Sequence, residues 1–212
     1  MMKPMVKSLI AASIMAASVG AQAGLSANVG VTSDYLFRGV NLSDGAALYA
    51  GIDYEAENGF FAGAWGIGYD DPDQDEVEVD LYFGYGNSIG DFSYSVGYTG
   101  FFYDELDVDI HELNFNLGYS FLNLEVTFAD EEDSRPGEPD DDYIFTALTA
   151  EYEGAYLTYG NFSEDVDGSY VELGYGASVQ GVDLGIAYVN AEDKLSDPDD
   201  TIYVTLTKTF DL

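Results

Sequence analysis

The sequence predicts an all-β protein, a transmembrane antiparallel up-and-down β-barrel of about twelve strands, with about ten or fourteen strands as alternatives. Three observations predict this class. After residue 24, apolar and polar residues alternate with a period of two in one short segment after another. The connectors between these segments are alternately very short and long, as in a barrel with tight turns at one rim and long loops at the other. No apolar run beyond residue 24 approaches the roughly 18 residues of a membrane-spanning helix.

Residues 1–23 are predicted to be a signal peptide. Lys3 and Lys7 form a positively charged start, an apolar run follows from Leu9 to Val19, and Ala21-Gln22-Ala23 fits the small-residue pattern that precedes cleavage. Residues 24–212 then form a single domain, because no linker or fixed-period repeat divides them. An exported chain that lacks spanning helices can cross a membrane only as a closed barrel.

The alternating segments define the predicted strands in order. Within 76–87, for example, Val77, Val79 and Leu81 alternate with Glu78 and Asp80, which produces one apolar and one polar face. The first strand is expected to continue to Arg38, with Tyr35 and Phe37 on its apolar face; the segment from Tyr143 to Glu151 is ambiguous, because both of its faces hold apolar residues. The predicted strands are 25–38, 46–56, 60–69, 76–87, 92–103, 110–120, 122–129, 143–153, 155–163, 168–178, 182–191 and 201–211.

The connectors predict how the barrel is oriented. The short ones lie at 57–59, 88–91, 121–123, 153–154 and 180–181, and they hold only three acidic residues, Glu57, Asp91 and Glu153. The long ones are crowded with Asp and Glu, above all between Asp130 and Asp142. With an even strand number and a periplasmic N-terminus, the long acidic loops face the outside of a Gram-negative cell.

The charge balance excludes several functions. Without Lys3 and Lys7, four basic residues remain (Arg38, Arg135, Lys194 and Lys208) against 40 acidic ones, which argues against nucleic-acid binding. The absence of cysteine excludes a disulfide scaffold. A soluble β-sandwich is the alternative fold, but its exposed face and edges would more often carry Lys, and this chain has almost none.

Near the C-terminus, Ile202, Val204, Leu206 and Phe210 lie on the apolar face of the last strand. This pattern is similar to the terminal-strand signal that the barrel assembly machinery reads, which makes that machinery an expected partner. Lys208 interrupts the face, and the chain ends in Asp211-Leu212 rather than in an aromatic residue.

Five motifs carry a resemblance to a known family. They are Ser33-Asp34-Tyr35-Leu36-Phe37-Arg38-Gly39, Gly51-Ile52-Asp53-Tyr54-Glu55, Gly59-Phe60-Phe61-Ala62-Gly63-Ala64-Trp65, Val77-Glu78-Val79-Asp80-Leu81-Tyr82 and the closing Thr207-Lys208-Thr209-Phe210. Together they resemble the TorF family of porins, over essentially the whole mature chain. The resemblance implies a β-barrel in the outer membrane of Gram-negative bacteria with a role in transport.

The predicted polar face of the first strands carries a candidate charge network in the lumen. Its members are Asp34, Arg38, Asp53, Glu55, Glu78 and Asp80. Either they brace the barrel wall as ion pairs, or they form a constriction that selects permeating ions. Other inward carboxylates (Glu112, Glu125, Glu151, Glu172 and Asp183) have no cationic partner that the sequence reveals.

The long loops supply candidate sites for Ca²⁺ or Mg²⁺, because carboxylate oxygens are the ligands these cations prefer. The candidates are Asp70, Asp71, Asp73, Asp75, Asp104, Asp107, Asp109, Asp197, Asp199 and Asp200. The loops do not have EF-hand spacing, and cations held there could also bridge to the phosphates of lipopolysaccharide. No other cofactor is expected.

The leading functional hypothesis is a porin-like barrel through which small solutes diffuse, with a preference for cations that comes from the acidic loops and lumen. The alternative is a non-conducting structural or adhesive barrel whose loops bind divalent cations or partners. Catalysis is not expected, because the single histidine, His111, lies on the apolar face of its strand without a nucleophile that the sequence places beside it.

Overall fold

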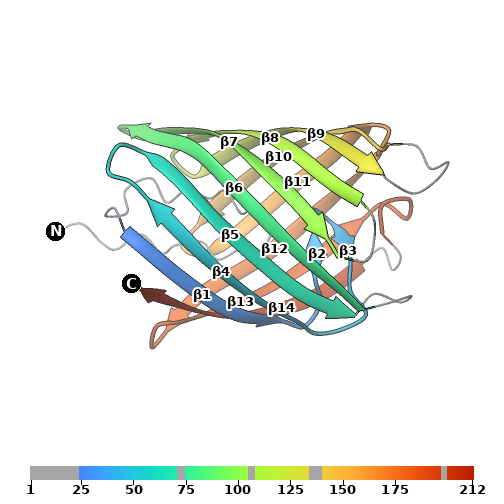
Figure 1. Cartoon of the computed structure of the whole chain (residues 1–212), viewed down its shortest axis with the longest axis horizontal. Coiled ribbons are helices and arrows are strands. Elements are labelled where there is room, and N and C mark those ends of the chain that lie inside the picture. The colour runs from blue at the N-terminus through green and yellow to red at the C-terminus, as the bar shows by residue number, and fades with distance from the viewer. Residues whose placement is uncertain (1–23, 71–74, 105–107, 134–139, 197–199) are drawn as a thin grey trace.

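The computed structural model describes residues 24–70, 75–104, 108–133, 140–196 and 200–212. Within these residues, twelve antiparallel strands close a barrel in which neighbours in sequence are neighbours in space, and β1 pairs with both β14 and β4 (Figure 1). The predicted barrel is therefore confirmed. No helix in the described part of the chain is long and apolar enough to cross a membrane.

The barrel wall consists of long strands joined by short turns at one end and longer connectors at the other (Figure 1). The start of β1 and the end of β14 lie at the short-turn end, where the backbone N–H of Leu212 donates to the carbonyl of Leu25. The wall strands are β1 (Gly24–Thr32), β4 (Ala47–Glu55), β5 (Phe60–Asp70), β6 (Asp75–Ile89), β7 (Phe92–Tyr103), β8 (Val108–Tyr119), β9 (Leu122–Asp133), β10 (Tyr143–Tyr152), β11 (Ala155–Glu164), β12 (Gly168–Val179), β13 (Val182–Ala191) and β14 (Asp200–Asp211).

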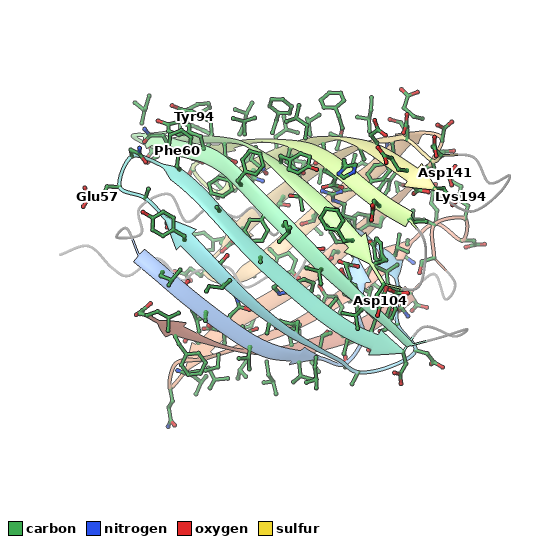
Figure 2. All side chains as sticks on the ribbon, viewed as in Figure 1. Glu57, Phe60, Tyr94, Asp104, Asp141 and Lys194 are labelled. Carbon is green, nitrogen blue, oxygen red and sulfur yellow. The ribbon has the colours of Figure 1, made fainter. Side chains whose placement is uncertain are left out.

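The period-2 pattern places the apolar face outward. On β6, Val77, Val79 and Leu81 are exposed, whereas Glu78 and Asp80 point into the barrel and are buried. Figure 2 shows the outward side chains around the wall, with Glu57, Phe60 and Tyr94 at the short-turn end and Asp104, Asp141 and Lys194 at the other. A continuous apolar exterior is what a barrel presents to lipid.

The prediction for the first strand is wrong at its C-terminal end. β1 stops at Thr32, and the chain then turns into the barrel and forms a hairpin of β2 (Leu36–Phe37) and β3 (Val40–Asn41) inside the lumen (Figure 1). Tyr35 and Phe37, expected to face lipid, therefore lie in the barrel interior, where Tyr35 is buried.

Local chemistry explains this inward turn. The Thr32 hydroxyl donates to the carbonyl of Asp34 at 2.6 Å, and the backbone N–H of Tyr35 donates to the Ser43 hydroxyl at 2.7 Å, which satisfies polar groups as the chain leaves the wall. At the hairpin tip, Arg38 and Gly39 both have positive φ, 47° and 85°, as the two central residues of a type I′ turn require. The hairpin is therefore a local structure of the chain and not a continuation of the wall.

The hairpin packs inside the half of the lumen near the long connectors. Leu36 packs into an aromatic cluster with Phe145, Phe162 and Tyr170, while Tyr35 packs on the opposite wall. Burial of Tyr35 and Leu36 stabilises this arrangement by about 1.5–3 kcal/mol each. Inward residues near this end are buried, and those near the short turns are partly exposed, as the contrast between Ala187 and Asp183 on β13 illustrates.

The ambiguous segment from Tyr143 to Glu151 forms β10. Its odd-numbered residues Tyr143, Phe145 and Ala147 face the lumen and join the aromatic cluster, which explains why both faces of the strand are apolar.

Candidate functional site

Arg38, at the tip of the hairpin, reaches across the lumen to the wall formed by β8 and β9. Its guanidinium donates twice to Glu112, through Nη1 to Oε1 and at 3.1 Å through Nη2 to Oε2, and Nη2 also donates to Glu125 at 2.8 Å. The hydroxyl of Thr127 accepts a weaker bond at 3.3 Å. We call Arg38, Glu112, Glu125 and Thr127 the Arg38 cluster. Arg38 is only 4% exposed and Glu112 only 2%.

Two aromatic rings hold the guanidinium of Arg38 between them. Its central carbon lies 4.7 Å from the ring centroid of Phe37 and 4.3 Å from that of Phe145. Such contacts stabilise a desolvated cation by about 2 kcal/mol or more. The Tyr143 hydroxyl also donates a hydrogen bond to Glu112, at 2.7 Å.

A second group of carboxylates lies on β6, which only β7 separates from β8. Glu78 and Asp80, which we call the acidic pair, are 1% and 0% exposed. The Tyr35 hydroxyl donates to one oxygen of Glu78 at 2.6 Å. Among the residues that the structure describes, no N–H or O–H group donates to the other oxygen of Glu78 or to either oxygen of Asp80, and the buried Nε of Arg38 has no acceptor.

The structure divides the predicted charge network between separate parts of the lumen and its short-turn end. Arg38 pairs with Glu112 and Glu125, two carboxylates for which the sequence revealed no cation. The physical reason is the inward hairpin, which carries Arg38 off the wall, away from Asp53 and Glu55 on β4, and across the lumen.

The other predicted members of the network lie apart from the Arg38 cluster. Asp53 accepts bonds from the Tyr82 hydroxyl and, at 3.2 Å, from the Asn28 amide. Asp34 accepts a bond from the neighbouring Ser33 hydroxyl at 2.8 Å, and Glu55 lies at the short-turn end of β4. Neutral donors therefore satisfy several inward carboxylates without any cation.

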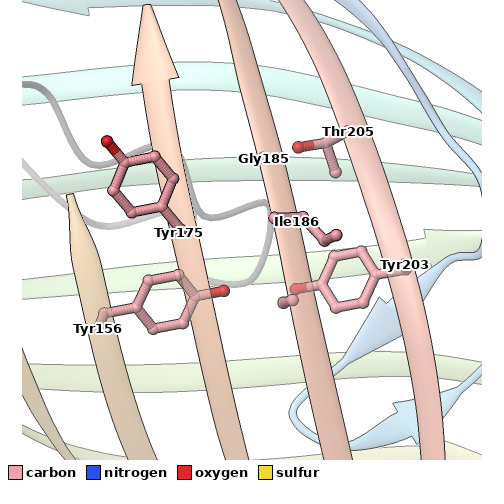
Figure 3. A pocket seen from close by; sticks show the side chains of 7 residues that line it. Tyr156, Tyr175, Gly185, Ile186, Tyr203 and Thr205 are labelled. Atoms are coloured by element: carbon pink, nitrogen blue, oxygen red, sulfur yellow. The ribbon is translucent and has the colours of Figure 1, made fainter.

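Glu172 on β12 is such a carboxylate. The hydroxyls of Tyr156 and Tyr203 both donate to its Oε1, at 2.5 and 2.9 Å. These hydroxyls point toward one another beside a small pocket, also lined by Gly185 and Thr205, with room for about one water molecule (Figure 3). This site braces the wall and is too small for a solute.

The predicted cation sites in the loops are only partly described. Asp71, Asp73, Asp107, Asp197 and Asp199 lie outside the described residues, and Asp75 begins β6. Asp70 ends β5, Asp109 lies on β8, and Asp200 begins β14. Among the residues that the structure describes, no group of three or more His, Cys, Asp or Glu side chains could hold a metal ion.

Asp104 has a structural role at the end of β7. Its Oδ1 accepts the backbone N–H of Val77 at 2.9 Å, and its own N–H donates to Glu76 at 3.0 Å. The bond from Val77 is the main reason that the pKa of Asp104 is lowered from its usual value. This carboxylate therefore anchors the edge of a connector.

His111 lies on the outer face of β8, where the prediction placed it. Its Nδ1 shares a hydrogen bond of 2.6 Å with the Tyr98 hydroxyl, and the ring packs edge-on against Phe102. Its cross-strand neighbours are Gly100 and Asp130, so the described residues place no Ser, Thr or Cys nucleophile directly opposite it.

Sequence reasoning did not identify the residues that contact Arg38, which are Glu112, Glu125, Thr127 and Phe145. The available signal was the dipeptide Arg38-Gly39 between Phe37 and Val40, which fits a two-residue hairpin. Even with that hairpin, alternation alone would not have identified which distant strands Arg38 contacts.

Comparisons with known proteins agree with this architecture. A family model described as "Bacterial protein of unknown function (Gcw_chp)" matches residues 16–212. A search of curated proteins found no match.

Solved structures with a similar fold were found. One is described as "KdgM porin in complex with disordered oligogalacturonate", with a TM-score of 0.59, 8% identity, and coverage of 88% of this chain and 98% of that one. A second, described as "Unveiling the Mechanism Behind the in-meso Crystallization of Membrane Proteins", has a TM-score of 0.57 and 9% identity, and covers 89% of this chain and 83% of that one. At such identities the likeness concerns the fold.

Proposed function

The chain belongs to the Gcw_chp family of bacterial proteins, and we propose that it is a porin-like barrel of the Gram-negative outer membrane through which small solutes, preferentially cations, diffuse. The seated hairpin is the closed state of this channel. The channel opens when the hairpin leaves the lumen.

The observation that carries this proposal is the imbalance of charge around the hairpin. The described part of the lumen buries one cation, Arg38, against the carboxylates of Glu76, Glu78, Asp80 and Glu112, whereas the Glu172 carboxylate is satisfied by two tyrosine hydroxyls. Such a lining attracts cations and repels anions. It also disfavours acidic sugars such as the oligogalacturonate bound by the KdgM porin.

The remaining features of the proposal concern location and partners. The apolar exterior contacts lipid and lipopolysaccharide, the chain termini are periplasmic, and the acidic loops are extracellular. The alternating apolar residues of β14 are read by the barrel assembly machinery. The resemblance of several motifs to those of the TorF porins supports the same location, and Ca²⁺ or Mg²⁺ bound at the outer loops is a separate part of the proposal.

The experiment is conductance in planar bilayers with the hairpin free or locked. The natural chain contains no cysteine, and a Cβ at Gly39 would lie 2.7 Å from the Cβ of Tyr170. After a shift of about 1 Å, and with backbone strain at the φ of 85° of residue 39, a Gly39→Cys/Tyr170→Cys pair can form a disulfide between hairpin and wall. We expect cation-selective conductance steps from the natural protein and from the reduced cysteine variant, and no conductance from the oxidised variant.

Two controls and two outcomes complete this test. Each single-cysteine variant should conduct regardless of oxidant. Equal conductance of the locked and reduced proteins would show that the hairpin does not close the channel. A preference for anions in a salt gradient would overturn the cation-selective form of the proposal.

A second function, a non-conducting structural or adhesive barrel, is favoured by the filled half of the lumen near the long connectors. It predicts no conductance steps from either the natural protein or the reduced cysteine variant. The proposal assigns no catalysis to this barrel, since His111 faces outward and bonds to Tyr98.

A further inference from the structure

The Arg38 cluster shows how this lumen recognises a guanidinium group. Glu112 accepts two bonds from Arg38, Glu125 accepts a third, and the rings of Phe37 and Phe145 cover the group. Bonds to carboxylates combined with aromatic stacking are the standard means by which proteins bind guanidinium and ammonium groups. Arg38 reaches this position only as the tip of an inserted turn.

The seated hairpin leaves the lumen incompletely paired. Within the described parts of the chain, no donor reaches either oxygen of Asp80 or one oxygen of Glu78, and no acceptor reaches the buried Nε of Arg38. A plug with a purely structural role would be expected to satisfy the polar groups that it covers, because each unsatisfied group costs free energy. Asp80 on β6 and Glu112 on β8 are separated by the single strand β7.

The surroundings of the acidic pair are aromatic. On the lumen face, Asp80 lies between its cross-strand neighbours Trp65 and Phe101. The hairpin covers both rings, with Tyr35 at 6.1 Å from Trp65 and Phe37 at 5.6 Å from Phe101, measured between ring centroids. When the hairpin leaves, two carboxylates and a set of aromatic faces become accessible together.

This chemistry distinguishes between classes of cation. Ca²⁺ and Mg²⁺ require about six or more oxygen ligands, whereas the acidic pair offers three unpartnered oxygens and the described residues contain no group suited to a metal. An organic cation uses a few carboxylate oxygens together with aromatic faces. The acidic pair therefore matches an organic cation better than a metal ion.

We propose that the acidic pair and the Glu112–Glu125 pair are neighbouring binding positions for an organic cation that carries a guanidinium or primary ammonium group. Arg38 occupies the second position while the hairpin is seated. This inference rests on the proposed function and gives it a solute class. It also explains why the lumen contains more buried carboxylates than its own cation can neutralise.

The test is calorimetric titration of the folded mature protein in detergent micelles with agmatine, which carries a guanidinium group at one end and an ammonium group at the other. The variant Arg38→Ala removes the tethered competitor, so agmatine should bind at least about tenfold more tightly than to the natural protein. Adding Asp80→Asn to Arg38→Ala should weaken binding at least about tenfold.

The matched control is Glu172→Gln in the Arg38→Ala background, which also removes a buried lumen carboxylate but on a different part of the wall. Its affinity for agmatine should be unchanged. Equal affinities of the natural and Arg38→Ala proteins, or an Asp80→Asn variant that binds normally, would overturn the assignment. So would saturable heat from magnesium or calcium chloride in place of agmatine.

A refolding measurement covers the case in which Arg38→Ala does not fold alone. Methylguanidinium should then restore the yield of folded barrel, and sodium chloride at the same concentration should not; equal yields would reject the site. Binding is measured in micelles and does not depend on conductance. A barrel that binds agmatine but shows no conductance in bilayers would therefore overturn the channel function and leave the binding site standing. A barrel that conducts ions but does not bind agmatine would overturn the proposed solute class and leave the channel function standing.

Discussion

Replacing Glu112 by alanine is expected to destabilise the barrel more than any other single change at a lumen carboxylate. Glu112 accepts two bonds from Arg38 and one from the Tyr143 hydroxyl, and all three groups are buried. The substitution therefore leaves a desolvated cation without its main partner.

The expected magnitude follows from what remains around Arg38. Removing one member of a buried ion pair costs about 3–5 kcal/mol, because the other charge stays buried without compensation. Glu125 still accepts a bond at 2.8 Å and Thr127 one at 3.3 Å. These contacts place the expected loss at the lower end, about 3 kcal/mol in the free energy of unfolding.

The assay is equilibrium urea unfolding in detergent micelles, followed by the fluorescence of Trp65, the single tryptophan of the chain. Glu151→Ala is the matched control, since Glu151 also faces the lumen but is only partly buried, and it should change stability by less than about 0.5 kcal/mol. A loss below about 1 kcal/mol for Glu112→Ala would match an exposed ion pair and refute the reasoning.

Three further predictions concern the wall. Gly174→Val would place a Cβ 2.2 Å from the Tyr156 ring, so the free energy of unfolding should fall by about 1–3 kcal/mol. Gly68→Ala, at a position with open space around it, should not lower this free energy. Leu173→Arg, in the middle of the exposed face of β12, should cost about 2–4 kcal/mol in lipid vesicles, against about 0–1 kcal/mol for Val179→Arg at the strand end; equal costs would contradict a lipid-facing belt. His111→Ala should cost about 0.5–1.5 kcal/mol through loss of the Tyr98 bond and leave agmatine binding unchanged, and a change in that binding would contradict the outward placement of His111.

The wall of the barrel could be predicted because its signal is local. Alternation on β6 separates Val77 and Val79 from Glu78 and Asp80, and a shift by one residue would move the carboxylates to the outside. The positions of the short turns then follow from where alternation stops, as at Gly90 and Asp91 between β6 and β7.

The lumen could not be predicted in the same way, because its contacts join residues far apart in sequence. Alternation in the sequence continues from Thr32 to Arg38, which predicts a straight strand. The structure instead turns the chain inward, since the Ser33–Ser43 region satisfies its polar groups locally and Arg38-Gly39 form a tight turn. Tyr35 and Phe37 thereby change from lipid-facing to lumen-facing residues.

The wall strands, apart from the end of the first, the acidic long connectors and the carboxylate-rich polar face follow from the sequence alone, because each depends on a two-residue period or on composition. The pairing of Arg38 with Glu112 and Glu125, and the burial of Asp80 without a donor among the described residues, come from the three-dimensional fold. These facts depend on barrel closure, which brings a hairpin near the N-terminus against strands more than 70 residues away. Whether a buried carboxylate is paired is a property of that three-dimensional arrangement and not of any local pattern.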